Sequence, residues 1–317
     1  MFSIDYDEYR KKIEGIFQSE MEQSPDIDIK RILLVLTNPN SRQEILRVVS
    51  RLVLFERAQI KVLNGLYYYQ SLADQIGFKI KTIEELIEEI KKENMTAAEI
   101  EVVREGDPFQ GICEIVQTGR VDLIVIQSPF ADIIETEKRR QNYLGKTIES
   151  LISFVMHDTD IPLIIIKDPK KLFVEVFNQI TMLVSDWFNP RLFKTLIWFC
   201  GNTKSVIKIL PYYLQALMEN ESKDKIIEIA ELKIKKMIYN IEFWLKSHAV
   251  DIITEGLPFI YDYNRIIGII EDQNPDLLAL FVPRRPEIIP HFQDLTRKIE
   301  TNIIIVPEFG LEKRNKR

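Results

Sequence analysis

Short apolar runs alternate with longer amphipathic segments along most of the chain. The runs predict buried strands at residues 32–36, 100–103, 122–126 and 163–166, and again at 180–184, 250–253, 276–282 and 303–306. Between them lie segments with apolar residues at helical spacing, including a long one at residues 223–246. Near-continuous apolar strands separated by amphipathic helices are typical of a parallel sheet that helices cover on both faces.

A four-residue phrase occurs twice at the same place in this pattern. Residues 105–108 read Glu-Gly-Asp-Pro and residues 255–258 read Glu-Gly-Leu-Pro. Each phrase follows a strand-like run and precedes a helical pattern, at residues 108–118 and 258–271, and then another buried strand. Glycine allows a sharp turn out of the strand, and proline suits the first turn of a helix. The sequence therefore predicts an α/β fold with two tandem doubly wound domains, each built on a five-stranded parallel sheet.

The repeat also suggests where the domains begin and end. We expect an N-terminal helical extension at 1–28, a first domain at 29–168, a linker at 169–177, a second domain at 178–308 and a charged tail at 309–317. The extension carries Ile13, Ile16 and Phe17 at helical spacing, so we interpret it as a docking helix rather than a domain.

Composition narrows the class of protein. The chain has 317 residues, of which 46% are hydrophobic and 28% charged, which suffices for two ordinary cores. A net charge of -6 provides no basic field, so we expect no nucleic-acid partner. The apolar runs are far shorter than the roughly 18 residues of a spanning helix, so we expect no membrane insertion. The first residues do not resemble a secretory signal, and a cytoplasmic location is the expectation.

The sequence shows no catalytic or metal-binding constellation. Cys113 and Cys200 are not at metal-ligand spacing, and the histidines are scattered without nearby acidic or cysteine ligands. No nucleophile elbow and no pair of carboxylates on a helix face is visible. We therefore predict that the protein is not an enzyme and has no catalytic or metal-ligating residues.

Residues 100–126 connect these patterns to a known family. They read IEVVREGDPFQGICEIVQTGRVDLIVI, with a valine-rich strand, a glycine and proline, an amphipathic helix and then Asp-Leu-Ile-Val. On these residues the chain resembles a tandem, two-domain universal stress protein, across residues 30–168 and more weakly across 178–308. The resemblance implies a Rossmann-like fold, a role in stress responses, and binding of ATP or AMP at the carboxyl ends of the first domain's strands.

The family's phosphate-binding pattern is degenerate in this chain. Family members that bind ATP have a Gly-x-x-Gly loop after the fourth strand and, further on, a Gly followed by Ser or Thr, whose N–H groups cradle phosphates. Here Gln127 and Ser128 follow the fourth strand, and the later element survives as Gly145, Lys146 and Thr147. These three residues either still hold a phosphate or form an ordinary capped helix start; Arg140 stands where a Walker A loop requires glycine.

The base-binding position differs between the two copies. The family's adenine-contacting aspartate falls at Thr37 and Asn38 in the first copy. In the second copy, Asp186 either contacts a base or ribose or caps the helix that starts at Pro190. Arg285, after the fourth strand of that copy, belongs either to a charged turn or to an anion site. The candidate nucleotide-binding residues are Thr37, Asn38, Gln127, Ser128, Gly145, Lys146, Thr147 and Asp186.

Two functional hypotheses follow. The first is a non-catalytic regulatory protein that binds an adenine nucleotide in its first domain. The second is a nucleotide-independent interaction module, for example of a transporter or stress complex, with a protein partner or a second copy as its target. An exposed apolar patch would favour the second hypothesis.

Overall fold

The computed structural model describes the chain in stretches: residues 15, 17–19, 21–24, 28–36, 45, 58–64, 85, 88, 92, 99–101, 108–119, 121–127, 151–168, 177–185, 190–200, 205–213, 223–248, 250–254, 259–260, 262–283, 285 and 288–308. The chain forms two compact units. The first-copy unit comprises Asp28–Val176 and Val282–Arg317, and the second-copy unit comprises Met1–Ile27 and Phe177–Phe281. The domain limits 29–168 and 178–308, with the linker between them, stay a prediction.

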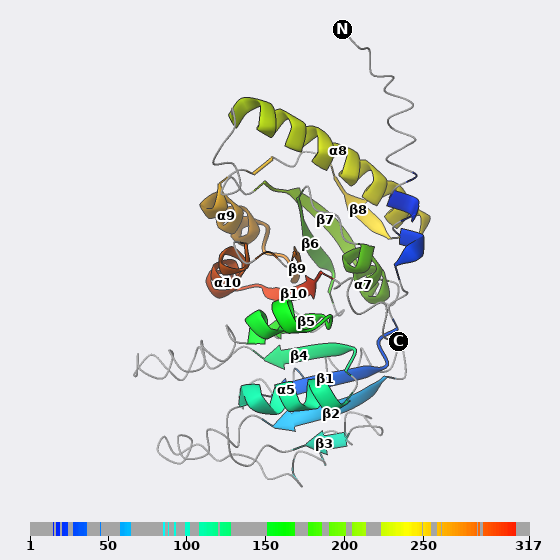
Figure 1. Ribbon diagram of the computed structural model, residues 1–317, viewed down its shortest axis with the longest axis vertical. Coiled ribbons are helices and arrows are strands. Elements are labelled where there is room, and N and C mark those ends of the chain that lie inside the picture. The colour runs from blue at the N-terminus through cyan, green and yellow to red at the C-terminus, as the bar shows by residue number, and fades with distance from the viewer. Residues whose placement is uncertain are drawn as a thin grey trace. The chain divides into compact units, whose positions relative to one another are not determined.

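Five parallel strands form the centre of the first-copy unit (Figure 1). They are β1 (Arg31–Leu36), β2 (Gln59–Asn64), β3 (Glu99–Glu101), β4 (Leu123–Gln127) and β5 (Leu163–Ile166), in the order β3-β2-β1-β4-β5. The chain moves outward from β1 to β3 and then returns to place β4 on the other side of β1. All side chains of β4 and β5 are buried, which explains their continuous apolar sequence.

The second-copy unit repeats this order. Its strands are β6 (Gln179–Val184), β7 (Val206–Pro211), β8 (Asp251–Ile253) and β9 (Leu277–Val282), arranged β8-β7-β6-β9 with parallel pairing. The first strand again lies between the second and the fourth. The predicted α/β fold class, with doubly wound and mostly parallel strands, is therefore confirmed. The second copy was predicted to have five parallel strands, but the structure describes four, β6 to β9.

An aspartate before the fourth strand holds the start of the first strand in both copies. Asp122 Oδ2 accepts from the backbone N–H groups of Lys30 (3.1 Å) and Arg31 (2.9 Å). In the second copy, Asp276 Oδ2 accepts from those of Asn178 and Gln179, both at 3.0 Å. This shared contact is independent structural support for the repeat seen in the sequence.

The last strand pairs in an unexpected direction. The sequence predicts a strand at 303–306 as the end of the second copy, and β10 (Asn302–Pro307) occupies that place. It runs antiparallel to β5, with Ile304 opposite Ile164, and so adds an antiparallel strand after the five parallel ones. An apolar run buried on both faces carries no information about direction, so the sequence did not indicate this pairing.

The helices mostly begin where the sequence predicts. They include α5 (Pro108–Gly119), α7 (Pro190–Cys200), α8 (Lys223–Ser247), α9 (Tyr263–Gln273) and α10 (Ile289–Lys298). The prediction that the helix after the second glycine-proline phrase starts at residue 258 is wrong. Ile260 is extended and pairs in parallel with Tyr212, and Asp262 caps α9 by accepting from the Asn264 N–H at 2.9 Å. In the described part of the chain, no helix is long and apolar enough to cross a membrane.

The N-terminal extension packs on the second-copy unit. Its described residues 17–19 and 21–23 are helical, and we call them the N-terminal helical segment. Phe17 and Met21 are buried, and the rings of Phe17 and Phe193 on α7 are 6.5 Å apart. Lys194 Nζ donates to the Ser24 carbonyl at 2.5 Å. Apolar contacts and one charged hydrogen bond thus fix this segment to α7.

Candidate functional site

The crevice expected from the strand order lies where β1 and β4 meet. These strands are parallel neighbours with Val35 opposite Ile126, so their last residues, Leu36 and Gln127, also lie side by side. The chain leaves β1 toward β2 and leaves β4 toward β5, on opposite sides. Ligands of open α/β sheets bind outside the carboxyl ends of the strands at such a switch point.

The structure places one of the eight candidate residues. Gln127 is the last residue of β4 and is only 1% exposed, so its side chain contributes to the floor beneath the crevice rather than to an open wall. The other seven, Thr37, Asn38, Ser128, Gly145, Lys146, Thr147 and Asp186, lie outside the described residues. Whether they come together around a ligand stays a prediction.

Aromatic residues after β7 extend the sheet of the second-copy unit. The Tyr212 N–H donates to the Val184 carbonyl at 2.9 Å, and the Tyr213 N–H donates to the Ile260 carbonyl at 2.9 Å. Tyr212 is buried, as is Ser185 after β6. Tyr212 therefore belongs to the packed end of the sheet.

Arg285 lies in a tight backbone turn. Its N–H donates to the Pro283 carbonyl at 2.8 Å, and its own carbonyl accepts from the Ile288 N–H at 3.0 Å. The backbone geometry agrees with the turn interpretation of this charged segment.

A lysine and an asparagine form a buried polar cluster at one end of the β5–β10 pair, which we call the latch. Asn302 Oδ1 accepts from the N–H groups of Lys167 (2.8 Å) and Asp168 (2.9 Å), and its Nδ2 donates to the Asp168 carbonyl at 3.1 Å. The Lys167 ammonium donates to the carbonyls of Thr296 and Ile299 at the end of α10. A positive charge is favourable at a helix C-terminus.

Burial changes the ionisation of the latch lysine. Loss of solvent lowers the pKa of Lys167 to about 8, and the nearby negative charge of Glu300 acts in the opposite direction. Because the Lys167 ammonium donates to backbone carbonyls, we assign this lysine a structural role. The latch could not be predicted from the sequence, because its members are far apart along the chain.

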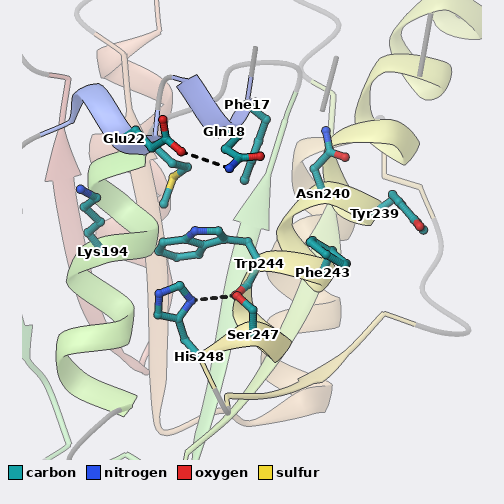
Figure 2. A pocket seen from close by; sticks show the side chains of 11 residues that line it. Phe17, Gln18, Glu22, Lys194, Tyr239, Asn240, Phe243, Trp244, Ser247 and His248 are labelled. Carbon is teal, nitrogen blue, oxygen red and sulfur yellow. Dashed lines mark hydrogen bonds between the residues drawn. The ribbon is translucent and has the colours of Figure 1, made fainter. Parts of the chain in front are cut away.

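A cavity of about 870 Å³ opens between the N-terminal helical segment, α7 and α8. Figure 2 shows the side chains that line it. They are Phe17, Gln18, Met21, Glu22, Lys194, Tyr239, Asn240, Phe243, Trp244, Ser247 and His248. The sequence predicts an amphipathic helix at residues 223–246 but did not indicate the cavity. The available signal was an aromatic cluster on this helix together with the separate helical extension.

The described residues offer little support for a reactive thiol or for a metal site. Burial raises the pKa of Cys200 to about 12, which keeps that thiol protonated and unreactive at neutral pH. Within those residues, no three His, Cys, Asp or Glu side chains gather closely enough to hold a metal ion.

Comparison with known proteins shows which family of solved structures has the same fold. No family model and no curated protein matches the sequence. Among solved structures, a universal stress protein from Archaeoglobus fulgidus DSM 4304 is 14% identical with a TM-score of 0.54, over 87% of this chain and 96% of that one. The chain has the fold of the universal stress proteins. At this identity the likeness concerns the fold and not the ligand.

Two structures from Pseudomonas aeruginosa agree with this result. A functionally unknown protein from strain PAO1 is 12% identical with a TM-score of 0.57, over 88% of this chain and 92% of that one. A protein from strain UCBPP-PA14 that was assigned to the universal stress proteins is also 12% identical, with a TM-score of 0.51, over 88% and 93%. The match spans both copies, because most of each chain is covered.

Proposed function

We propose that the protein is a non-catalytic, cytoplasmic regulator in stress responses that binds an adenine nucleotide, ATP or AMP, in its first copy. The observation that carries this proposal is the β1–β4 switch point, where Leu36 and Gln127 end neighbouring parallel strands. A doubly wound sheet places its ligand crevice there. Thr37 and Ser128 are the next residues along the chain, and we propose that they border this crevice.

The candidate residues divide into two roles. Thr37 and Asn38 would border the base or ribose, and Ser128 would border the phosphates beside Gln127. Gly145, Lys146 and Thr147 would supply backbone N–H groups and one ammonium to the phosphates at a helix start. Asp186 would serve the corresponding position of the second copy. Binding alone, without bond cleavage, would make the nucleotide a regulatory signal.

A calorimetric titration tests the proposal. Nucleotide-stripped protein is titrated with ATP and AMP, and the stripped fraction is examined by mass spectrometry. We expect saturable micromolar binding that is lost in Gly145→Asp, because a side chain and a negative charge would oppose the phosphates. Gly268→Asp is the matched control, since a Cβ at Gly268 on α9 meets nothing within 4 Å. No binding and no co-purified nucleotide would overturn the proposal.

A hydrolysis assay tests the non-catalytic part separately. We expect no release of phosphate from ATP above that of a buffer control. Hydrolysis that Lys146→Ala abolishes, while ATP still binds, would show instead that the first copy is an enzyme site.

One observation favours a second candidate, an interaction module that pairs with another copy of this chain. Leu232, Tyr239 and Phe243 share one face of α8 and are 44%, 48% and 71% exposed. Ile253, on β8, is also exposed, and α8 packs against β8. Light scattering on size-separated protein would detect a dimer, which Leu232→Glu should dissociate and the exposed neighbour Lys233→Glu should not. A monomer at all concentrations would exclude this candidate.

A further inference from the structure

The cavity beside α8 has the size and walls of a small-molecule site. Its volume of about 870 Å³ lies within the range of roughly 300–1,000 Å³ that is usual for such sites. Four aromatic side chains line it, from Phe17, Tyr239, Phe243 and Trp244, together with Met21. Flat rings and a thioether favour a planar aromatic ligand, because aromatic pairs stack or meet edge to face.

One lining side chain is polar, buried and without a partner. Asn240 is only 6% exposed, and its amide makes no hydrogen bond to any residue that the structure describes. Asn302, which is also buried, uses its amide in three hydrogen bonds. The amide nitrogen and oxygen of Asn240 are not sealed from solvent, so water in the cavity satisfies them, and a ligand with matching groups can take the place of that water. Figure 2 shows the Asn240 side chain among those that surround the cavity.

A second donor lies nearby. The indole N–H of Trp244 makes no hydrogen bond to the described residues, whereas other polar groups of the cavity are engaged. His248 Nδ1 is 2.9 Å from the Trp244 carbonyl and 3.1 Å from Ser247 Oγ, and its ring lies 4.3 Å from the indole. Gln18 Nε2 donates to Glu22 Oε1 at 3.1 Å. Spare hydrogen-bonding capacity therefore centres on Asn240 and Trp244.

We infer that this cavity binds a planar nitrogen heterocycle whose edge presents a hydrogen-bond donor beside an acceptor. A carboxamide carries both an acceptor oxygen and a donor NH₂, so Asn240 pairs with such an edge through two hydrogen bonds. The ring system stacks within the aromatic walls, and the indole N–H of Trp244 serves a further acceptor on the ligand. The N-terminal helical segment supplies Phe17 and Met21, so its docking completes the site.

This inference does not rest on the proposed nucleotide site. The described lining residues all belong to the second-copy unit, and Gln127, the candidate nucleotide-binding residue that the structure describes, is not among them. Loss of nucleotide binding in Gly145→Asp would leave this cavity intact, and a change at Asn240 would leave the first copy's crevice intact.

A matched pair of neutral probes tests the pairing edge. 2-Quinolone is a bicyclic lactam with an N–H beside its carbonyl, and coumarin has the same shape with a ring oxygen in place of that N–H. In calorimetric titrations of the full chain, we expect 2-quinolone to bind about tenfold more tightly than coumarin, the effect of one neutral hydrogen bond. Equal binding of the two probes, or no binding of 2-quinolone, would overturn the inference.

Asn240→Leu distinguishes a ligand-binding role from a structural one. Leucine keeps the volume and removes the amide, so the preference for 2-quinolone over coumarin should disappear while the melting temperature stays the same or rises. Asn264→Leu, at an exposed position on α9, is the matched control and should keep the preference. A melting temperature lowered by Asn240→Leu, or an unchanged preference, would contradict the inference.

The aromatic walls can be tested without risk to the core. Phe243 is 71% exposed, so Phe243→Ala should leave the melting temperature unchanged. The same substitution should weaken the binding of 2-quinolone and of coumarin by a similar factor of about five to ten, because each loses one aromatic contact. Unchanged binding of both probes in Phe243→Ala would show that they bind outside this cavity.

Discussion

The two copies start their first strands with the same backbone contact, but the strand begins with an arginine in the first copy and a glutamine in the second. Asp122 and Asp276 each accept two backbone N–H groups. In the first copy Asp122 also meets the Arg31 guanidinium, with Nη2 to Oδ1 at 3.0 Å and Nε to Oδ2 at 3.1 Å. Gln179 occupies the place of Arg31 in the second copy. The backbone contact therefore belongs to the fold that the two copies share, whereas the Arg31–Asp122 ion pair depends on a side chain that the second copy does not have at this place.

The β5–β10 pair shows a second difference between the copies. Its register is centred on Ile164 opposite Ile304, so corresponding residues of the two strands should make corresponding contacts. Asn302 is the first residue of β10 and forms the latch, but Pro162 stands at the matching place, directly before β5. Proline has no amide side chain with which to bind the opposite strand end. One end of the pair is therefore held by the hydrogen bonds of the Asn302 side chain, and Pro162 cannot supply the same bonds at the other end.

The largest effect is expected from removing the latch. Asn302→Ala removes the partner of two N–H groups and one carbonyl of the half-buried residues 167 and 168. We expect the free energy of unfolding in urea to fall by about 3 kcal/mol, because each lost hydrogen bond to a buried group costs about 1 kcal/mol or more. Asn264→Ala, on the exposed face of α9, should change it by less than about 0.5 kcal/mol.

The result would decide how the antiparallel pair is held. If Asn302→Ala and Asn264→Ala had equal, small effects, the apolar contacts of the two strands alone would hold β5 and β10 together. The two ends of the pair would then be equivalent in energy despite their different side chains.

The next effect concerns the pH dependence of the latch lysine. Burial lowers the pKa of Lys167 from 10.5 to about 8, so between these values the unfolded chain binds more protons than the folded one. Stability therefore rises with pH across this window, by at most about 3 kcal/mol. The measurement is urea unfolding from pH 7 to 11 (about one unit per step) for the natural chain and Lys167→Met.

Subtracting the stability of Lys167→Met from that of the natural chain at each pH leaves the contribution of Lys167 alone. Cys200 has the opposite influence, since its pKa is raised from 9.0 to about 12 and its contribution to stability is lost as pH rises above 9.0. This contribution is common to both proteins and cancels in the difference. A difference curve that is flat from pH 8 to 10.5 would show that the latch lysine is solvated.

Much of the fold could be predicted because strands that are buried on both faces have continuous apolar sequences. The continuous apolar runs of β4, β5 and β9 reflect strands covered on both faces, and α5 begins at Pro108 as its glycine-proline phrase predicts. The start of α9 was not predictable from the matching phrase, because Ile260 continues the sheet by pairing with Tyr212. The glycine-proline phrase predicts a turn, but it does not determine how many residues follow before the helix begins. In the second copy, the pairing of Ile260 with Tyr212 delays the start of α9 to Tyr263.

The candidate site was harder to predict, for two physical reasons. The family pattern names loop residues, of which the structure places Gln127, and a buried glutamine at a strand end does not identify a ligand. The cavity beside α8 depends on contacts between Phe17 and Phe193, which are far apart in the sequence. Asn240 looks like an ordinary polar residue within the apolar repeat of the helix, and only its burial without a partner distinguishes it.

The smallest predicted effect tests the ion pair by exchanging it between the copies. Arg31→Gln should lower the free energy of unfolding by about 0.5 kcal/mol, a value reduced by solvent because the Arg31 side chain is 38% exposed. Gln179→Arg should recover a similar amount in the double variant, because Asp276 presents the same carboxylate to the start of β6. In about 1 M salt, where the Debye length is only about 3 Å, the differences should vanish. If Arg31→Gln instead costs as much as Asn302→Ala, the guanidinium is required by the fold of the first copy, and the backbone contact of Asp122 does not suffice without it.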